Sequence, residues 1–457
     1  MSHSSNVDYL IVGAGITGLT AGYVLSRKGK SVRIIEKKDR PGGAMQSKRD
    51  GEWLAECGAG SILESSELIK KLIEQLDLQE EQVLSSPEAQ KRYLVKNERI
   101  SPVPDSILRF FWSDLLSRKA KRNVLIEPFT KAEQFDDESL ADFVRRRLGE
   151  ELLDQFINPL VGGIYAGDPE RLSVRNGFPR LQALEDQYGS LIKGQIRGLK
   201  KDPKRREIPR NKARTFSFRD GVQTLPERLA EKTDATIEYK TSLSGLFSTD
   251  TGFKAMLESD DKNNSLFANH VVMTVPAYTL SEIPIDEKTD VWGNIGEIPY
   301  APVSVINLGY HKDAIDHPLD GFGVLIPQKE NYRILGVQFN STVFEGRAPE
   351  NHVMLTVFLG GMRYPDLPQK PESEQLDITK KDLNKLLGVK SEPVFTYITS
   401  WPKAIPQYVV GYKSYLEIMD EIENKYPGLY LAGNYRGGIS VGDCITNAIL
   451  LGEELSK

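Results

Sequence analysis

The spacing of apolar residues predicts a strand, a helix and a second strand at the start of the chain. Residues 9–12 form a short apolar run, and apolar residues at helical spacing follow from Ile16 to Val24. Residues 31–35 form a second apolar run. Short apolar runs are typical of buried strands, whereas recurrence every three or four residues is typical of an amphipathic helix. The helix is expected to end at Gly29, where a glycine can terminate it.

The same patterning divides the rest of the chain into segments of different kinds. Residues 107–192 have mainly helical spacing, whereas residues 299–359 contain four strand-like runs close together. Closely spaced strands of this kind suit an antiparallel sheet. Apolar strands at residues 270–275 and 427–432 lie before and after that segment, as if the chain returned to its first sheet. We therefore expect an α/β protein in which a helical region and an antiparallel sheet are inserted.

Three glycines lie between the first strand and its helix, at Gly13, Gly15 and Gly18. In a G-x-G-x-x-G turn the first glycine makes the tight bend, the second lets the backbone approach a pyrophosphate, and the third lets helix and strand pack closely. Glu36 ends the second strand, where a carboxylate can accept a hydrogen bond from a ribose hydroxyl. A chance glycine cluster on a buried helix is the alternative, but strand, helix and acidic residue all fall at the expected places. The segment predicts a dinucleotide site that also includes Ala14, Ile16, Thr17 and Lys37.

A second glycine motif, R-x-G-G-x-x-x-S, follows at Arg40, Gly42, Gly43 and Ser47. It resembles the second fingerprint of FAD enzymes related to amine oxidases, although an ordinary surface turn would also suit these glycines. Glu36 disfavours the 2'-phosphate of NADP. The chain shows no histidine or cysteine signal for covalent attachment, so we expect non-covalently bound FAD.

Composition narrows the class of protein further. The chain has 457 residues, enough for two or three domains, and its net charge of -5 disfavours nucleic acid as a partner. Cys57 and Cys444 are its only cysteines, without the spacing of a metal site, which predicts a reduced, cytoplasmic compartment. Residues 1–6 do not resemble a signal peptide, and nothing approaches ~20 uninterrupted apolar residues.

The expected fold is therefore α/β, with a discontinuous Rossmann-like FAD-binding domain, an inserted antiparallel-sheet substrate domain and a helical insertion. We assign residues 1–90, 215–280 and 410–457 to the FAD-binding domain. Residues 91–214 form the helical, membrane-facing insertion, and residues 281–409 form the substrate-binding sheet domain.

Three longer motifs indicate a family. Residues 162–174 read GGIYAGDPERLSV, residues 217–229 read SFRDGVQTLPERL, and residues 428–445 read GLYLAGNYRGGISVGDCI. With the two FAD fingerprints, they resemble the oxygen-dependent protoporphyrinogen oxidase family over essentially the whole chain. The resemblance implies FAD-dependent oxidation of protoporphyrinogen IX to protoporphyrin IX in haem biosynthesis, with molecular oxygen as acceptor. Oxidation of coproporphyrinogen III to coproporphyrin III remains an alternative, because the two macrocycles differ only in carboxyethyl versus vinyl arms.

The resemblance also implies roles for individual residues. Arg92 would pair with a substrate propionate, Phe358 would stack on a pyrrole ring, and Leu325 would clamp another ring. Gln338 stands where the family has a second clamping leucine, and could hydrogen-bond a propionate or point elsewhere. Gly162 and Gly163 would place backbone beside the reacting ring. From the residues alone, Arg92 would be a surface ion pair, and Leu325 and Phe358 ordinary core.

Further cofactor contacts are implied by the resemblance, and one departure, at Ala44, changes little. Ala44 stands where many relatives in the wider superfamily have a second arginine.

No side chain is named as catalytic, since the five histidines are scattered and hydride transfer to a flavin needs no side-chain base. A non-catalytic escort protein of the same fold is the alternative of another class, although the retained R-x-G-G argues against it. The remaining cofactor residues are Leu243, Trp401, Gly433, Ser440 and Val441.

Two segments predict peripheral binding to a membrane. Residues 197–214 contain nine basic residues, although such a run is more commonly a solvated loop. Phe110, Phe111 and Trp112 are consecutive, and successive helical residues project ~100° apart, so one of them should be exposed. The sequence leaves the oligomeric state open, a homodimer included. The apolar cluster comprises Ile107, Leu108, Phe110, Phe111, Trp112, Leu115 and Leu116.

Overall fold

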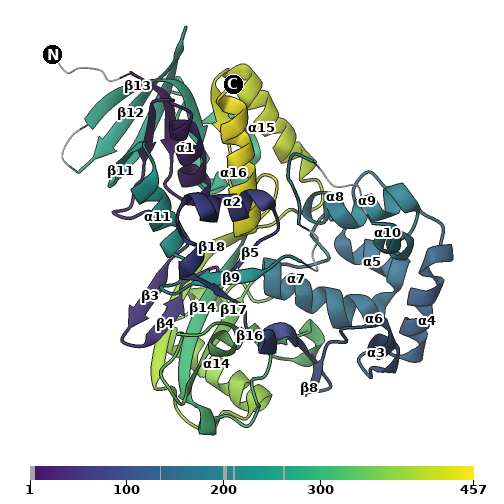
Figure 1. Cartoon of the computed structure of the whole chain (residues 1–457). Coiled ribbons are helices and arrows are strands. Elements are labelled where there is room, and N and C mark those ends of the chain that lie inside the picture. Colours follow the sequence, from purple (N-terminus) through teal and green to yellow (C-terminus); the bar gives the residue numbers. More distant parts are fainter. Residues whose placement is uncertain (1–5, 134, 199–202, 209–211, 261–262) are drawn as a thin grey trace.

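The computed structural model describes residues 6–133, 135–198, 203–208, 212–260 and 263–457. Figure 1 shows two sheets, one above the other, with a region of helices standing beside them. The C-terminal end of the chain lies by the upper sheet. Part of the basic run predicted at residues 197–214 lies outside the described residues, as do the side chains of Ile107 and Leu108.

The upper sheet has a parallel core, as the apolar pattern predicted. Its order is β10-β2-β1-β13, with β19 pairing with the last part of β13, and these strands are all parallel. The predicted return of the chain to the first sheet is therefore confirmed. The bounds are β1 (Asn6–Val12), β2 (Val32–Ile35), β10 (Thr236–Glu238), β13 (Asn263–Met273) and β19 (Leu429–Leu431).

Apolar layers cover both faces of this sheet. In β1, Tyr9 and Ile11 face one cluster, whereas Leu10 and Val12 face the other. Burial on both faces is characteristic of parallel sheets covered by helices. The helices packed around it are α1 (Ile16–Arg27), α2 (Glu67–Gln75), α11 (Thr224–Lys232), α15 (Lys413–Lys425) and α16 (Val441–Leu455). The antiparallel strands β11 (Thr241–Thr249) and β12 (Gly252–Ser259), which the sequence did not predict, extend it beside β13.

The lower sheet has the order β18-β14-β17-β16-β15-β7-β8 and is antiparallel except where β15 meets β7. Helix α14 (Glu372–Leu387) packs on one face through Leu383, Leu386 and Leu387. The opposite face is turned toward the helical region and the upper domain. The bounds are β7 (Tyr93–Lys96), β8 (Arg99–Pro102), β14 (Tyr300–His311), β15 (Gly323–Leu325), β16 (Ile334–Gln338), β17 (His352–Gly360) and β18 (Phe395–Pro406).

Two features of the lower sheet differ from the sequence interpretation. Residues 91–102 were placed in the helical insertion, but β7 and β8 pair into this sheet. A single short strand carries too little pattern to reveal its distant partner. Strand β18 was not predicted, because it is an edge strand with two prolines, a lysine and few buried side chains. Edge strands need no continuous apolar run.

The helical region is held together by buried charge as well as apolar packing. Arg147 and Glu127 are both fully buried and form an ion pair. Glu127 also accepts hydrogen bonds from Ser190 Oγ (2.6 Å) and Leu191 N (2.9 Å), at the start of the last helix. The bounds are α3 (Ile107–Trp112), α4 (Arg118–Ile126), α5 (Leu140–Leu148), α6 (Glu150–Leu152), a π-helical turn (Leu153–Ile157), α7 (Asn158–Tyr165), α8 (Val174–Gly177), α9 (Pro179–Tyr188) and α10 (Leu191–Arg197).

Short strands connect these parts. Strands β3 (Ser47–Asp50) and β4 (Trp53–Glu56) form a hairpin, and β5 (Ile62–Leu63), β9 (Thr215–Phe218) and β6 (Gln82–Leu84) form a small sheet. Two one-turn helices, α12 (Ala277–Leu280) and α13 (Asn340–Val343), complete the described elements apart from short 3-10 turns. Among the described residues, none of the helices has the length and apolar character needed to cross a membrane.

Candidate functional site

The three glycines after β1 have different roles in the structure. Gly13 has φ +106°, a conformation that side chains other than glycine rarely adopt. A Cβ at Gly18 would lie 2.0 Å from the carbonyl oxygen of Gly13, so the helix could not pack as it does. A Cβ at Gly15 would meet no atom within 4 Å. Gly13 and Gly18 are thus required by the fold, whereas Gly15 leaves open space at the start of α1.

That open space adjoins backbone donors suited to an anion. Helix α1 starts at Ile16, its N-cap is Gly15, and in the described structure no side chain caps it. Uncapped amides at a helix N-terminus favour a phosphate group. Helix α16 packs against α1, and the Cys444 thiol in its first turn lies near the Thr17 hydroxyl; burial raises the pKa of this thiol to about 12. Ser440 and Val441, at the start of α16, are therefore near the glycine turn.

Glu36 is held at the end of β2 by the backbone around it. Its carboxylate oxygens accept hydrogen bonds from Ala14 N (2.8 Å) and Lys38 N (2.9 Å). A carboxylate has about four lone-pair positions, so both oxygens can still accept from ribose hydroxyls. Glu36 is half-buried and Lys37 is exposed, as expected at the mouth of a nucleotide site.

The second fingerprint lies directly on the first. Gly42 N donates to Ala14 O (2.8 Å), and a Cβ at Gly43 would lie 3.4 Å from Gly15 Cα. The Arg40 guanidinium donates to Pro41 O and Gly43 O, both at 3.0 Å, and so fixes the turn. Ala44, the departure noted in the sequence, is exposed beside it.

A buried carboxylate lies behind the second fingerprint. Ser47 Oγ donates to Glu56 Oε2 (2.6 Å), and Val222 N donates to Glu56 Oε1 (3.1 Å). Burial raises the pKa of Glu56 to about 7, against these hydrogen bonds and the nearby charge of Arg347. Arg347 is itself fully buried, and its Nε and Nη1 have no partner among the described residues.

The lower sheet is tied to the segment that follows Glu56. Asn307 Nδ2 donates to Glu56 O (2.9 Å), and Trp401 Nε1 donates to Cys57 O (2.6 Å). The Lys38 ammonium lies 5.7 Å from the centre of the Trp401 ring, so Trp401 also borders the loop after Glu36. These contacts place one face of the lower sheet against the cofactor domain.

Two other candidate cofactor residues lie at the edge of the upper sheet. Leu243 is buried in β11, two residues after Thr241, whose amide donates to Glu36 O (2.9 Å). Gly433 follows β19 and has φ +155°, with the Tyr435 ring 2.8 Å from where its Cβ would be. Leu243 thus lies near Glu36, and Gly433 follows the strand that pairs with the end of β13.

The candidate substrate residues meet on the face of the lower sheet that is turned away from α14. Leu325 is paired with Gly336, and Gly336 with Phe358, so the two side chains flank a glycine in one row across three strands. Helix α7 covers this row, because a Cβ at Gly163 would lie 2.3 Å from Leu325 Cδ2. The structure thus brings Gly163, Leu325 and Phe358 together.

Arg363 positions α7 on this sheet and was missed from the sequence. Its guanidinium donates to Asn158 O (2.8 Å) at the start of α7 and to Ile326 O (2.8 Å) just after β15. A Cβ at Gly162 would lie 2.7 Å from Arg363 Nη2, so this glycine leaves room for the arginine. Burial lowers the pKa of Arg363 to about 10. Nothing in its local sequence distinguishes it from a surface cation.

Gln338 and Arg92 lie farther along the same side. Gln338 is opposite Gly323 in β15, and Arg92 immediately precedes the Tyr93–Val324 pair of β7 and β15. Arg92 is exposed, with its guanidinium carbon 5.3 Å from the centre of the Phe322 ring. Gln338 is half-buried, and its Nε2 has no hydrogen-bond partner in the described part of the chain.

A buried polar chain crosses this face and was also missed. Asn340 Nδ2 donates to Thr356 Oγ1 (3.1 Å), and Thr356 Oγ1 donates to Asn307 Oδ1 (2.8 Å). Asn307 then reaches Glu56 O. Asn307 interrupts the long apolar run of β14, and a polar residue within such a run was the available signal.

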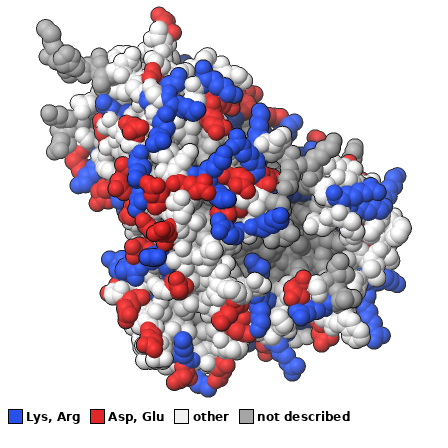
Figure 2. Space-filling view, viewed as in Figure 1, with Lys and Arg blue, Asp and Glu red and all other residues white. Residues whose placement is uncertain are grey.

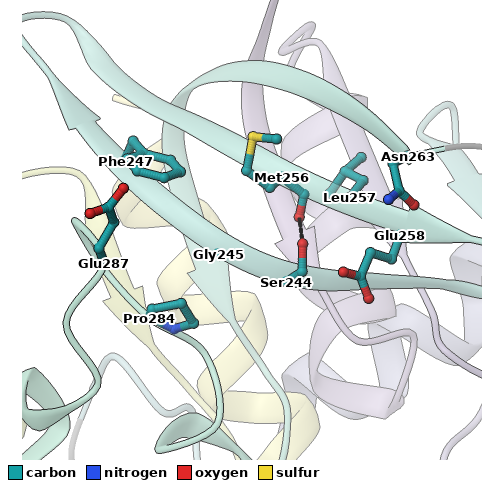
Figure 3. A pocket seen from close by; sticks show the side chains of 9 residues that line it. All are labelled: Ser244, Gly245, Phe247, Met256, Leu257, Glu258, Asn263, Pro284 and Glu287. Atoms are coloured by element: carbon teal, nitrogen blue, oxygen red, sulfur yellow. Dashed lines mark hydrogen bonds between the residues drawn. The ribbon is translucent and has the colours of Figure 1, made fainter.

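Two other cavities lie away from these residues. Figure 3 shows one of about 280 Å³ between the β11–β12 hairpin and Pro284. Another, of about 720 Å³, is lined by residues 82–84, 86–88, 341–343 and 345–353 together with Lys312. Neither is lined by a candidate cofactor or substrate residue, so the site described above is a separate feature.

Two glycine fingerprints in contact, an uncapped helix start and a parallel sheet define an FAD-binding protein of the doubly wound class. In such proteins the redox chemistry is the cofactor's, and the protein supplies orientation and the exclusion of water.

Comparisons with known proteins support the assignment to this class of FAD-binding proteins. The family model described as flavin containing amine oxidoreductase matches residues 16–450. Protoporphyrinogen oxidase 2 of Arabidopsis thaliana is 32% identical over 464 residues, covering 96% of this chain and 91% of its own. Coproporphyrinogen III oxidase of Bacillus subtilis (strain 168) is 27% identical over 459 residues, covering 95% of each. The crystal structure of a candidate protoporphyrinogen oxidase from Exiguobacterium sp. 255-15 superposes with a TM-score of 0.81 at 24% identity, over 99% of both chains.

The chain therefore belongs to the flavin-containing amine oxidoreductase family, in the group that includes the protoporphyrinogen and coproporphyrinogen oxidases of haem biosynthesis. Its cofactor is FAD, as the two fingerprints predicted.

The glycine turn gives a matched pair of variants. Gly15→Ala should fold normally but bind FAD at least about tenfold more weakly, because only the open space at α1 is filled. Gly18→Ala should lower the stability of the protein itself, by about 1 to 3 kcal/mol, because its Cβ overlaps Gly13 O. The measurements are thermal unfolding without added FAD and the flavin released on denaturation. Equal unfolding temperatures for the two variants would contradict this division of roles, and flavin retained on the denatured chain would contradict non-covalent binding.

Glu56 should make stability depend on pH. Its pKa is about 7 in the folded protein against 4.5 for an ordinary glutamate, so the folded state binds more protons between these values. The free energy of unfolding should therefore fall as pH rises from ~4.5 to ~7, by about 3 kcal/mol at most, since one pKa unit is ~1.4 kcal/mol. Glu56→Gln should remove this fall in urea unfolding of the FAD-loaded protein. Glu52→Gln, at an exposed carboxylate in the same hairpin, is the control and should leave the slope unchanged.

Proposed function

We propose that the protein oxidises protoporphyrinogen IX to protoporphyrin IX in haem biosynthesis, with molecular oxygen as electron acceptor. The observation that carries this proposal is the row formed by Leu325 and Phe358 beneath α7, on a face that Asn307 and Trp401 tie to the cofactor domain. An apolar row of this kind suits a flat macrocycle next to the flavin. Figure 2 shows the surface hollowed between the helical region and the two sheets.

The side chains of this face would bind and orient the substrate. Phe358 would stack on one pyrrole ring, and Leu325, held under Gly163, would fix the distance of another ring from α7. Arg92, at the exposed end of the face, would pair with a propionate and keep it toward water. Bound FAD accepts two electrons at a time, so removing six electrons from the porphyrinogen takes three rounds with oxygen as oxidant. Glycine at 162 and 163 contributes by letting Arg363 and Leu325 lie against α7.

Oxidation of coproporphyrinogen III is the second candidate. One observation favours it, namely the buried, unpaired amide of Gln338 at a position where a vinyl arm offers no acceptor. The two oxidases named among the relatives, at 32% and 27% identity, leave both substrates to be tested.

The FAD-loaded protein should convert protoporphyrinogen to the fluorescent porphyrin, consuming oxygen and releasing three hydrogen peroxide molecules per macrocycle. Arg92→Ala should lower kcat/KM about tenfold, since a hydrogen bond to a charged group contributes ~1.5 to 3 kcal/mol and exposure places Arg92 at the lower end. Flavin content should not change. Arg99→Ala, at an exposed arginine on the neighbouring strand β8, is the control. No oxidation of either porphyrinogen by flavin-replete protein would refute the proposed function.

We also propose that the helical region binds a membrane surface peripherally. Of the three consecutive aromatic residues, Trp112 is 86% exposed, as the helical spacing required. Phe129 and Ile196 are also largely exposed in this region, at 85% and 81%. Lys193 lies 5.8 Å from the centre of the Phe129 ring, and Figure 2 shows further cations at the outer edge of the region. Exposed aromatics beside cations suit an anionic lipid surface.

Cosedimentation with liposomes tests this proposal. The protein should bind anionic liposomes at low salt and retain part of the binding at high salt, because salt screens charge but not inserted aromatics. Trp112→Ser with Phe129→Ser should abolish the salt-resistant part. Leu84→Ser, at a residue 47% exposed outside the helical region, is the control. Absence of binding to anionic and neutral liposomes under both conditions would refute membrane attachment through this region.

A further inference from the structure

Part of the basic run lies on the FAD-binding domain. Within residues 203–208, the backbone bonds to the chain around the start of α2, because Ile208 N donates to Ser65 O (2.9 Å) and Glu67 N donates to Arg206 O (3.0 Å). Both bonds are made between backbone atoms, so they fix the path of the segment. This part of the run therefore has a defined position, in contrast to the solvated loop that its charge suggested.

The Arg205 side chain extends from this segment to helix α16. Its Nη1 donates to Asn447 Oδ1 (2.7 Å), and its Nη2 donates to Asp443 Oδ1 (3.2 Å). The two acceptors are four residues apart, so they lie on one face of the helix and a single guanidinium can bridge them. Only 27% of the Arg205 side chain is exposed, and water therefore screens this ion pair only in part.

Both acceptors also contact the turn that precedes α16. Asn447 Nδ2 donates to Gly437 O (3.1 Å). Gly438 has φ +129°, and a Cβ there would lie 2.7 Å from the side chain of Asp443. The turn leads into the start of α16, where two of the candidate cofactor residues lie. A side chain that holds Asn447 and Asp443 in place thus also fixes the backbone at the cofactor site.

Arg205 also balances a charge at the start of α16. The Asp443 carboxylate lies in the first turn of this helix, and its Oδ2 accepts a hydrogen bond from Ser440 Oγ (2.6 Å). An unopposed carboxylate at this point would disfavour an anionic cofactor, because like charges repel strongly where water is partly excluded. The guanidinium of Arg205 offsets that charge.

We propose that Arg205 is a positioning residue for the cofactor. It holds the Gly437–Gly438 turn and the start of α16 in place, and so slows the release of FAD. The inference is independent of which macrocycle the protein oxidises, because it concerns the bound cofactor alone. It also gives the described middle of the basic run a role within the protein.

The rate of FAD release tests the inference without any porphyrinogen. FAD-loaded protein is diluted, and the free FAD is quantified in ultrafiltrates taken at timed intervals. Arg205→Gln should release FAD roughly three- to tenfold faster than the unaltered protein, since the lost ion pair is only partly exposed. Arg205→Lys keeps the charge but cannot bridge both acceptors, so its rate should be intermediate. Arg206→Gln, at an exposed arginine of the same segment, is the control and should release FAD at the original rate.

Two further measurements separate positioning from a general loss of stability. The difference in release rate between the unaltered protein and Arg205→Gln should narrow at high salt, because salt screens a partly exposed ion pair. Asn447→Ala removes the contact with the turn. In that background Arg205→Gln should accelerate FAD release by a smaller factor than it does alone, since the two residues act through one network.

The outcomes separate this inference from the proposed function. Equal release rates for Arg205→Gln and Arg206→Gln would refute the role of Arg205. The same acceleration with and without Asn447→Ala would refute its action through the turn. Faster release from Arg205→Gln, together with no oxidation of either porphyrinogen by the unaltered protein, would leave the positioning role intact and refute the proposed function.

Discussion

The close contact between the two glycine fingerprints is the constraint on which the rest of the structure depends. Gly42 N donates to Ala14 O, and Gly43 lies against Gly15, so two turns from different parts of the chain share one small volume. The turn at Gly13 and the packing of Gly18 fix where α1 starts. The packing of α16 against α1 then brings the start of the C-terminal helix to the same point. The cofactor position is therefore defined by backbone contacts that side chains would obstruct.

A chain of buried hydrogen bonds connects the second glycine fingerprint to the lower sheet. Ser47 of the second fingerprint binds the Glu56 carboxylate, and the carbonyl of Glu56 accepts from Asn307 in the centre of β14. Buried hydrogen bonds contribute modestly to stability but are costly to leave unmade, so they specify one arrangement of two surfaces. The proposed substrate face is thereby held in a defined relation to the FAD-binding domain, and Trp401 adds a second fixed contact through Cys57.

The sequence predicts those helices, strands and turns that have a local pattern of their own. The strand–glycine turn–helix unit, the parallel return of β13 and β19, and the strands β14 to β17 all have apolar runs or turns that mark them. The sequence did not predict strand β18 or the attachment of β7 and β8 to the lower sheet. An exposed edge strand and a short isolated strand have little pattern of their own. Arg363 and the Asn340–Thr356–Asn307 chain depend on partners far away in sequence, which no local motif encodes. The resemblance located Leu325, Gln338 and Phe358, and only the register between strands shows that they share a face.

The helical region differs from the two sheets in having ion pairs in its interior. Arg147 and Glu127 form a buried ion pair, and Arg146 bridges Glu138 and Glu185 at low exposure. Buried ion pairs seldom add much net stability, but breaking one is costly, so they favour a single packing of the helices. Some large apolar side chains of this region, among them Trp112 and Phe129, are exposed on its surface. A region held by oriented ion pairs can keep such residues exposed without collapsing onto them, and this arrangement is consistent with docking onto an apolar phase.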